Sequence, residues 1–269
     1  MSYKLQDVRP SFELKGRNYV VTGGGQGIGL AVCRAIAEYG GNIAVLDIKD
    51  KPEPEFDTLA GKFGVKTTYF KTDVSKEEQL NASWNKAMEF LGGVDGIFTS
   101  AGIAIDKPFT EISWQEAQRI QEINVLGSFF TAQLATKQMK KQGKGGSIVF
   151  VASVTSHSVL PGYRMSAYNA SKGGVRMMSN AIAAEVGEWG IRVNTISPGF
   201  IDSEQTAVVR ALKDERESAF MDTAPSLRRM GTQNDLTGAV IYLLSDASAY
   251  TTGADIAITG GIHNGRIHQ

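Results

Sequence analysis

The chain has 269 residues, with 28 Lys and Arg balancing 28 Asp and Glu, and this length suits a single α/β domain. A hydrophobic share of 42% is enough for a sizeable core and argues against disorder. The balanced charge argues against nucleic acid or an anionic membrane as the main partner. The single cysteine, Cys33, excludes an internal disulfide and a cysteine-based zinc site, and its position in a helical segment predicts a small buried apolar residue.

The first fifteen residues are polar, and no later apolar run is long enough to cross a membrane. We therefore expect a cytoplasmic protein that has no membrane partner.

Short apolar, β-branched runs alternate with longer segments of helical periodicity along the chain. The predicted strands are Asn18–Thr22, Asn42–Asp47, Thr67–Thr72, Val94–Thr99, Ser147–Ala152, Arg192–Ile196 and Asp255–Thr259. The predicted helices are Gly27–Tyr39, Lys76–Phe90, Trp114–Lys141, Ala167–Glu188 and Asn234–Leu244. Several strands are apolar on both faces, as in strands buried between helical layers. This pattern predicts a doubly wound, Rossmann-type parallel sheet of about seven strands with helices on both faces, in one domain over residues 1–269.

Two stretches interrupt the alternation. Lys49–Lys62 is charged and Pro-rich at its start, which predicts a surface loop leading into a weak helix. Phe200–Arg229 is a long charged excursion between the last two strands. Excursions of this length in a compact domain are usually functional, so we expect a substrate lid near residues 200–229, with a surface insertion as the alternative.

A glycine-rich turn follows the first predicted strand and opens the first helix. Its sequence, Thr22-Gly-Gly-Gly-Gln-Gly-Ile-Gly29, lets the backbone approach a pyrophosphate, while the helix N-terminus supplies amides and partial positive charge. No Lys-Ser/Thr pair follows the last glycine, which excludes a Walker A loop. The turn predicts a dinucleotide site that includes Gly23, Gln26, Gly27, Ile28 and Gly29.

Asp47 closes the second predicted strand. A carboxylate there can accept hydrogen bonds from both adenosine ribose hydroxyls and would repel a 2′-phosphate. Gln26 and Ile48 supply no positive charge where a 2′-phosphate would lie, although Lys49 and Lys51 lie close by in sequence. We favour NAD(H) and keep NADP(H) as the alternative cofactor. An ordinary structural aspartate is the alternative reading of Asp47.

Tyr168 and Lys172 are four residues apart in a predicted helix and share one face. A free tyrosine titrates near 10, and lowering its pKa to ~7 needs roughly 4 kcal/mol of preference for the phenolate. One ammonium about 4 Å away supplies that order of energy at an effective dielectric constant near 20. The pair therefore predicts a tyrosine general acid/base whose pKa is lowered by Lys172.

Two further polar residues join this pair. Ser153 follows the fifth predicted strand, where its hydroxyl would face the ligand crevice. Asn124 lies inside a predicted helix, where an amide is otherwise unfavourable and can bind a backbone carbonyl or a water. The set fits carbonyl reduction or alcohol oxidation, in which Ser153 and Tyr168 hold the substrate oxygen and Tyr168 exchanges its proton.

In this order the motifs resemble the short-chain dehydrogenase/reductase family in its compact single-domain form, from Lys15 to Ile262. By this resemblance Asp73 and Val74 frame an adenine, Lys172 also binds the nicotinamide ribose, and Asn124 supports a water that relays protons from Lys172. The resemblance implies further cofactor contacts, with Ile201 and Ser203 flanking the carboxamide, at Ala101, Gly102, Tyr168, Pro198, Gly199, Ile201 and Ser203.

Three features depart from the family pattern. The usual Asn-Asn-Ala-Gly is here Thr99-Ser-Ala-Gly102, which alters local hydrogen bonds but keeps small residues against the cofactor. Ser203 stands where a threonine is common. The loop Val154–Ala167 is two residues longer than in many relatives, as in fungal polyol and ketose reductases of the family.

The resemblance implies an NAD(P)-dependent oxidoreductase that interconverts a secondary alcohol and a ketone. A polyol or ketose and a specialised metabolite are both candidate substrates. The alternatives are a cofactor-sensing protein and a non-redox, cyclisation-type activity on the same fold. The complete set of Asn124, Ser153, Tyr168 and Lys172 argues against the cofactor-sensing protein, because a pure sensor needs none of them.

The histidines predict no metal site, because no carboxylate cluster lies near them in sequence. His157, in the long loop, could contact substrate, although a surface position is favoured, and His263 and His268 belong to the tail Gly260–Gln269. In the family this tail often reaches a neighbouring subunit. The resemblance implies a homotetramer or homodimer that uses the helices near Trp114–Lys141 and Ala167–Glu188.

Overall fold

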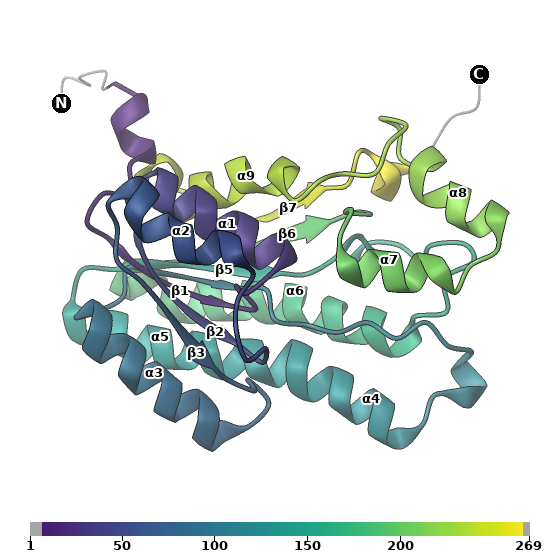
Figure 1. Cartoon of the computed structure of the whole chain (residues 1–269), viewed down its shortest axis with the longest axis horizontal. Helices are drawn as coiled ribbons and strands as arrows, with labels where there is room; N and C mark the ends of the chain where they lie inside the picture. The colour runs from purple at the N-terminus through teal and green to yellow at the C-terminus, as the bar shows by residue number, and fades with distance from the viewer. Residues whose placement is uncertain (1–6, 266–269) are drawn as a thin grey trace.

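The computed structural model describes residues 7–265, and within them seven parallel strands form one sheet in the order β3-β2-β1-β4-β5-β6-β7 (Figure 1). This confirms the predicted doubly wound Rossmann-type sheet. The strands are β1 (Asn18–Thr22), β2 (Asn42–Asp47), β3 (Thr67–Lys71), β4 (Gly96–Thr99), β5 (Gly146–Val151), β6 (Ile191–Pro198) and β7 (Asp255–Ile258).

Helices cover both faces of the sheet (Figure 1). One layer consists of α1 (Gly27–Glu38), α2 (Pro54–Phe63) and α9 (Asn234–Leu244). The opposite layer consists of α3 (Glu77–Leu91), α4 (Trp114–Gln121), α5 (Ser128–Gln142) and α6 (Ser166–Val186). Each layer closes its own apolar core against the sheet, which explains why the central strands are apolar on both sides.

The helix predicted over Trp114–Lys141 forms without a break in its helical backbone, but its hydrogen-bond pattern changes in the middle. A π-helical stretch, Glu122–Gly127, separates α4 from α5. The side chain of Asn124 in this stretch turns inward and bonds the backbone of Ile103, and Gly127 packs so closely on Val74 that a Cβ would lie 2.7 Å from Val74 Cγ2. Both contacts are made by residues within the π-helical stretch, whose turns are wider than those of an α-helix.

The excursion Phe200–Arg229 contains two helices, α7 (Glu204–Ala211) and α8 (Glu215–Thr223), which lie beyond the carboxyl ends of the strands (Figure 1). Ser203 caps α7, because its hydroxyl accepts a hydrogen bond of 3.2 Å from Thr206 N. Asp214 caps α8 in the same way, with 2.7 Å to Glu217 N. The weak helix expected after Lys49 is α2, and the other element ends differ from prediction by no more than two residues.

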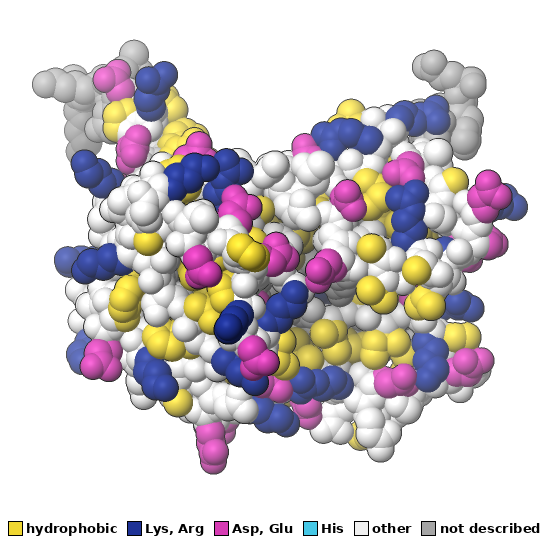
Figure 2. All heavy atoms as spheres, viewed as in Figure 1, with side chains coloured by type: hydrophobic (Ala, Val, Ile, Leu, Met, Phe, Trp, Pro, Cys, Tyr) yellow, Lys and Arg dark blue, Asp and Glu magenta, His cyan; other side chains and the backbone are white. Residues whose placement is uncertain are grey.

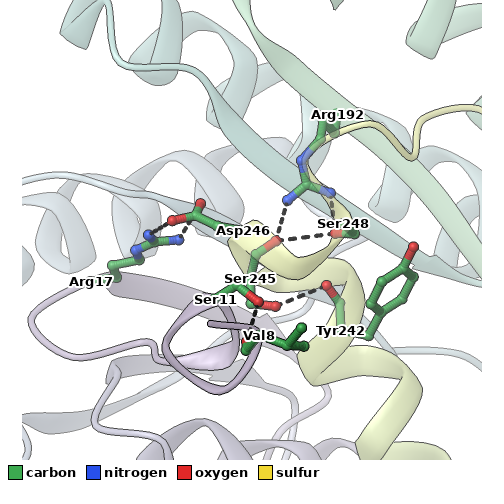
Figure 3. Close-up of polar contacts among 8 residues, drawn as sticks. All are labelled: Val8, Ser11, Arg17, Arg192, Tyr242, Ser245, Asp246 and Ser248. Atoms are coloured by element: carbon green, nitrogen blue, oxygen red, sulfur yellow. Dashed lines mark hydrogen bonds and ion pairs between the residues drawn. The ribbon is translucent and has the colours of Figure 1, made fainter. Parts of the chain in front are cut away.

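The opposite end of the sheet is closed by polar contacts between distant segments (Figure 3). Arg17, just before β1, pairs with Asp246 in the turn after α9. Arg192 of β6 donates to the Ser245 carbonyl at 3.0 Å and to Ser248 Oγ at 2.6 Å. These contacts tie the C-terminal segment to the amino ends of the strands.

Between β1 and β4 the strand order reverses direction, because β1 pairs with β2 on one side and with β4 on the other. Connections from the two strands therefore diverge and leave a crevice at their carboxyl ends, where ligands bind in this class of fold.

Cys33 on α1 is buried as predicted, and burial raises the pKa of its thiol. Within residues 7–265 no helix has both the length and the apolar character that spanning a bilayer requires.

Candidate active site

The glycine turn after β1 has no room for side chains at two of its positions. Gly23 has φ +70°, and a Cβ there would lie 2.7 Å from Ala101 N. A Cβ on Gly29 would lie 2.0 Å from the Gly23 carbonyl oxygen. The turn therefore packs backbone against backbone, and α1 begins at the edge of the crevice with its free amides facing a ligand.

The crevice collects residues from four strand ends. Those that the sequence predicted for the cofactor and that line it are Gly23, Gln26, Gly27, Ile28, Gly29, Asp47, Asp73, Val74, Ala101, Gly102 and Ser203. The lining residues that sequence reasoning did not assign to the site are Leu46, Ile48, Thr72, Ser100, Ile103, Arg119, Ile123 and Glu204. Arg119 and Glu204 lie far from the strand ends in sequence, and no local pattern marks them.

Asp47 is buried at the end of β2, and its carboxylate is fixed by two backbone amides. Gly25 N donates to Oδ2 at 2.9 Å, and Lys49 N donates to Oδ1 at 3.0 Å. Two basic side chains nearby are themselves paired, Lys49 with Glu204 at 3.6 Å and Lys71 with Asp50 at 2.5 Å. The crevice thus presents a negative group beside cations that already have partners.

Asp73 is held by a small polar network. Burial opposes its ionisation, but hydrogen bonds from Ser75 and an ion pair with Arg119 at 3.1 Å outweigh burial and lower the pKa of Asp73. Arg119 also donates to Ser75 Oγ at 2.6 Å. The network fixes the turn after β3 against α4.

Ser153, Tyr168 and Lys172 line a second cavity, which continues from the crevice through shared wall residues. Figure 2 shows the face hollowed near its centre, where α7 lies across from the strand ends. The sequence-predicted residues in the second cavity are Ile28, Gly102, Ser153, Tyr168, Lys172, Pro198, Gly199, Ile201 and Ser203.

The expectation that the pKa of Tyr168 lies below its usual value is wrong for this structure. Burial raises the pKa of the Tyr168 phenol, and a side-chain hydrogen bond with Ser153 only partly offsets it. Lys172 is buried too, and burial lowers its pKa to about 8. Its Nζ donates to the Val151 carbonyl at 2.7 Å and lies 5.8 Å from the centroid of the Tyr168 ring. Desolvation is the largest cause of both shifts, because burial favours the neutral form of each group.

Asn124 lines neither cavity and is fully buried behind them. Its Oδ1 accepts from Ile103 N at 2.9 Å, and its Nδ2 donates to the Ile103 carbonyl and to Ser171 Oγ, both at 3.0 Å. A Cβ on Gly102 would lie 3.2 Å from Asn124 Oδ1 and 3.6 Å from Lys172 Nζ. The two side chains therefore converge on one side of Gly102.

Ser100, which replaces the second asparagine of the usual Asn-Asn pair, joins two strand ends. Ser100 Oγ donates to the Thr22 carbonyl at 2.7 Å and so joins the ends of β4 and β1. Among the histidines, His157 Nε2 lies 2.7 Å from Asp255 Oδ2, and His263 Nδ1 lies 2.6 Å from Thr259 Oγ1, away from the cavity walls. His268 and the rest of the tail after residue 265 lie outside the described residues.

Comparisons with known proteins agree with this geometry. A family model described as enoyl-(acyl carrier protein) reductase matches residues 23–263. Sorbose reductase of Schizosaccharomyces pombe is 34% identical over 253 residues, which cover 93% of this chain and 97% of that protein. A short-chain type dehydrogenase/reductase from Mycobacterium marinum has a TM-score of 0.90 and 36% identity, covering 95% of this chain and 99% of the other.

A third similar protein is the NADPH-dependent 3-quinuclidinone reductase of Rhodotorula rubra, with a TM-score of 0.87 and 31% identity over 97% of both chains. The resemblance expected from the sequence, including the likeness to a fungal ketose reductase, is confirmed. The chain belongs to the short-chain dehydrogenase/reductase family and is an oxidoreductase that acts on CH–OH groups with NAD(P).

Proposed function

We propose that Tyr168 is the general acid/base for interconversion of a secondary alcohol and a ketone, and that Ser153 holds the reacting oxygen. The observation that carries this proposal is that both side chains line one cavity, which opens into the dinucleotide crevice. A substrate oxygen beside both hydroxyls lies where the two cavities meet.

NAD(P), when bound, supplies or accepts the hydride. In the reductive direction Tyr168 gives its phenolic proton to the substrate oxygen, and the Ser153 hydroxyl donates a hydrogen bond to the same oxygen. The raised pKa of Tyr168 keeps the phenol protonated before this step. The buried ammonium of Lys172 then stabilises the phenolate, while the Ser153 hydroxyl keeps its hydrogen bond to the substrate oxygen.

Asn124 is a positioning residue in this scheme. Its side chain fixes the segment at Ile103 and, through Ser171, the helix that carries Tyr168. Its convergence with Lys172 beside Gly102 supports a water that returns protons to Lys172.

We further propose that Pro198, Gly199, Ile201 and Ser203 contact the nicotinamide end of the cofactor. They line the cavity beside the proposed catalytic side chains, and Ser203 also reaches the crevice. The segment Phe200–Arg229 is proposed as a lid, because Phe200, Thr206, Val209 and Met221 supply one wall of this cavity.

We propose NAD(H) as the preferred cofactor, although the similar reductase from Rhodotorula rubra is NADPH-dependent. The fixed carboxylate of Asp47 supports this preference, because it suits ribose hydroxyls and repels a phosphate. Asp47→Ala should weaken NADH binding at least tenfold, because it removes charge-assisted hydrogen bonds to the ribose. It should also reduce the difference between the affinities for NADH and NADPH. Asp50→Ala, at an exposed pair close by, should leave both affinities unchanged. Unchanged affinities in Asp47→Ala would show that the carboxylate is only structural.

The activity itself is tested by oxidation of NADH and NADPH at 340 nm with ketoses, diketones and bulky cyclic ketones. Turnover that produces the alcohol supports the proposal. Tight cofactor binding with no turnover on any carbonyl would favour a sensing or non-redox role. The presence of Ser153, Tyr168 and Lys172 around one cavity argues against that role, because cofactor sensing needs none of them.

We also propose a homo-oligomer, either a tetramer or a dimer, that works in the cytoplasm, where nicotinamide cofactors are available. Large apolar side chains are exposed on the helices expected to form the contact, at Trp114, Leu126, Phe129, Phe130 and Met177. Sedimentation analysis of wild type and of Phe130→Glu would test the contact, and an unchanged mass in the variant would contradict it.

A further inference from the structure

Resting on the function proposed above, we infer that the substrate is a ketone with a largely apolar body and one additional oxygen that binds Thr155. A ketose or polyol, with hydroxyls on most carbons, does not fit the cavity's chemistry. The inference concerns the part of the cavity beyond Ser153 and Tyr168.

This part of the cavity is walled by an apolar cluster that is separate from the two cores of the sheet. Tyr163 packs on Phe200 with ring centroids 5.2 Å apart and on Phe220 at 6.2 Å. The apolar wall residues are Leu160, Met165, Phe200, Val209 and Met221, with the ring of Tyr163. Apolar surface of this kind favours an apolar ligand body, because both are desolvated on binding.

Charged groups are scarce in this wall. Among the described residues that line the cavity, Lys172 is the one charged side chain, and its Nζ already bonds the Val151 carbonyl. A substrate carboxylate or phosphate would therefore lack a free cationic partner. The substrate is accordingly neutral.

Most hydroxyls around the cavity are already engaged. Tyr163 donates to the Glu217 carbonyl at 3.3 Å, Thr206 Oγ1 lies 3.1 Å from Ser203 Oγ, and Ser100 donates to the Thr22 carbonyl. These oxygens can still accept hydrogen bonds, but most of their protons are committed. A polyhydroxylated substrate would therefore bury several oxygens without a side-chain donor, and each such oxygen weakens binding.

Thr155 is the exception. Its Oγ1 is buried and has no hydrogen-bond partner, yet the residue lines the cavity. Its backbone N donates to Ser153 Oγ at 3.2 Å, so Thr155 lies in the turn directly beside the proposed catalytic serine. A buried hydroxyl without a partner is unfavourable, and rotation of the Thr155 side chain about χ1 would turn it toward the cavity, where a ligand oxygen would satisfy it.

The test compares 2-tetralone, its ring-hydroxylated isomers, D-fructose and L-sorbose with NADH and with NADPH. We expect the tetralones to give higher kcat/KM than either ketose, and one hydroxylated isomer to exceed 2-tetralone. Thr155→Val should lower kcat/KM for that isomer about tenfold, while 2-tetralone changes less than twofold, because the lost interaction is one hydrogen bond. Thr155→Ser keeps the hydroxyl and should restore the preference.

Ser158→Ala is a matched control, because Ser158 Oγ is also buried and unpartnered in the same loop but does not line the cavity. It should leave the preference unchanged. Faster reduction of the ketoses, or an equal effect of Thr155→Val on both kinds of tetralone, would overturn the inference and leave the proposed function standing. Loss of all carbonyl reduction with cofactor still bound would overturn the proposed function and the inference that rests on it.

Discussion

A buried ion pair holds the proposed lid onto the body of the protein, and breaking it is a demanding test of the packing described here. Lys213, in the turn between α7 and α8, places Nζ 2.6 Å from Asp106 Oδ2, with side-chain exposures of 0% and 1%. The same ammonium donates to the Gly162 carbonyl at 2.6 Å and lies 4.5 Å from the Tyr163 ring centroid. The long loop is thus clamped between the lid and the segment after β4.

Asp106 also accepts from Arg164 Nε at 3.2 Å. Asp106→Asn removes the negative charge from both cations and leaves the buried Lys213 ammonium with neutral oxygens and an aromatic face. Breaking a buried pair in this way costs about 3–5 kcal/mol. Because the lid can open locally, the cost should fall on the lid rather than on the sheet. A cost at the lower end of this range raises the equilibrium constant for lid opening by at least ~100-fold, since each 1.4 kcal/mol changes an equilibrium constant about tenfold. Amide exchange in residues 204–223 should accelerate by the same factor.

Hydrogen–deuterium exchange followed by mass spectrometry measures this difference directly, with α1 as an internal reference that should not change. The double variant Asp106→Leu with Lys213→Met should retain slow exchange, because an apolar pair replaces the charges together. Asp222→Asn, at the exposed pair with Arg210, should accelerate exchange less than about fivefold. Less than threefold acceleration in Asp106→Asn would refute the reasoning.

Three further predictions follow from individual residues. Because burial lowers the pKa of Lys172 from 10.5 to about 8, the folded chain binds fewer protons than the unfolded chain between these values. Between pH 8 and 10.5 the free energy of unfolding of wild type, measured by urea denaturation, should therefore rise by up to about 3 kcal/mol relative to that of Lys172→Met. A difference between the two proteins that stays constant over this pH range would contradict the prediction. Gly29→Ala places a Cβ 2.0 Å from the Gly23 carbonyl oxygen and should raise the Kd for NADH at least tenfold by fluorescence titration; near-native affinity would rule out the tight turn. Gly61→Ala, in α2 with nothing within 4 Å of the added Cβ, should raise the free energy of unfolding by about 0.5–1 kcal/mol, and a loss of stability would count against the described helix.

Local patterns predicted most of the fold, because the strands, the glycine turn and α6 each depend on residues that are neighbours in sequence. The polar positions at strand ends, such as Asp47 and Ser153, also follow from topology, which brings parallel carboxyl ends to one edge. The sequence thus predicted most of the residues that line the two cavities.

Properties set by tertiary packing were beyond these patterns. The pKa of Tyr168 depends on burial, which no spacing reveals, and the charge of Lys172 alone gave the wrong direction. The π-helical stretch Glu122–Gly127 depends on a contact with the distant Ile103. The character of the substrate cavity depends on the meeting of Tyr163, Phe200 and Phe220, which lie in different segments.

The assignment of Tyr168 as the proton-transfer group is the central claim, and removal of its hydroxyl tests it most directly. The measurement is kcat/KM for ketone reduction by wild type and Tyr168→Phe, with the Kd for NADH determined on the same samples. The account predicts at least ~100-fold lower kcat/KM, the scale expected for loss of a general acid/base, with the cofactor Kd unchanged within about twofold. Near-native turnover by Tyr168→Phe would contradict the mechanism.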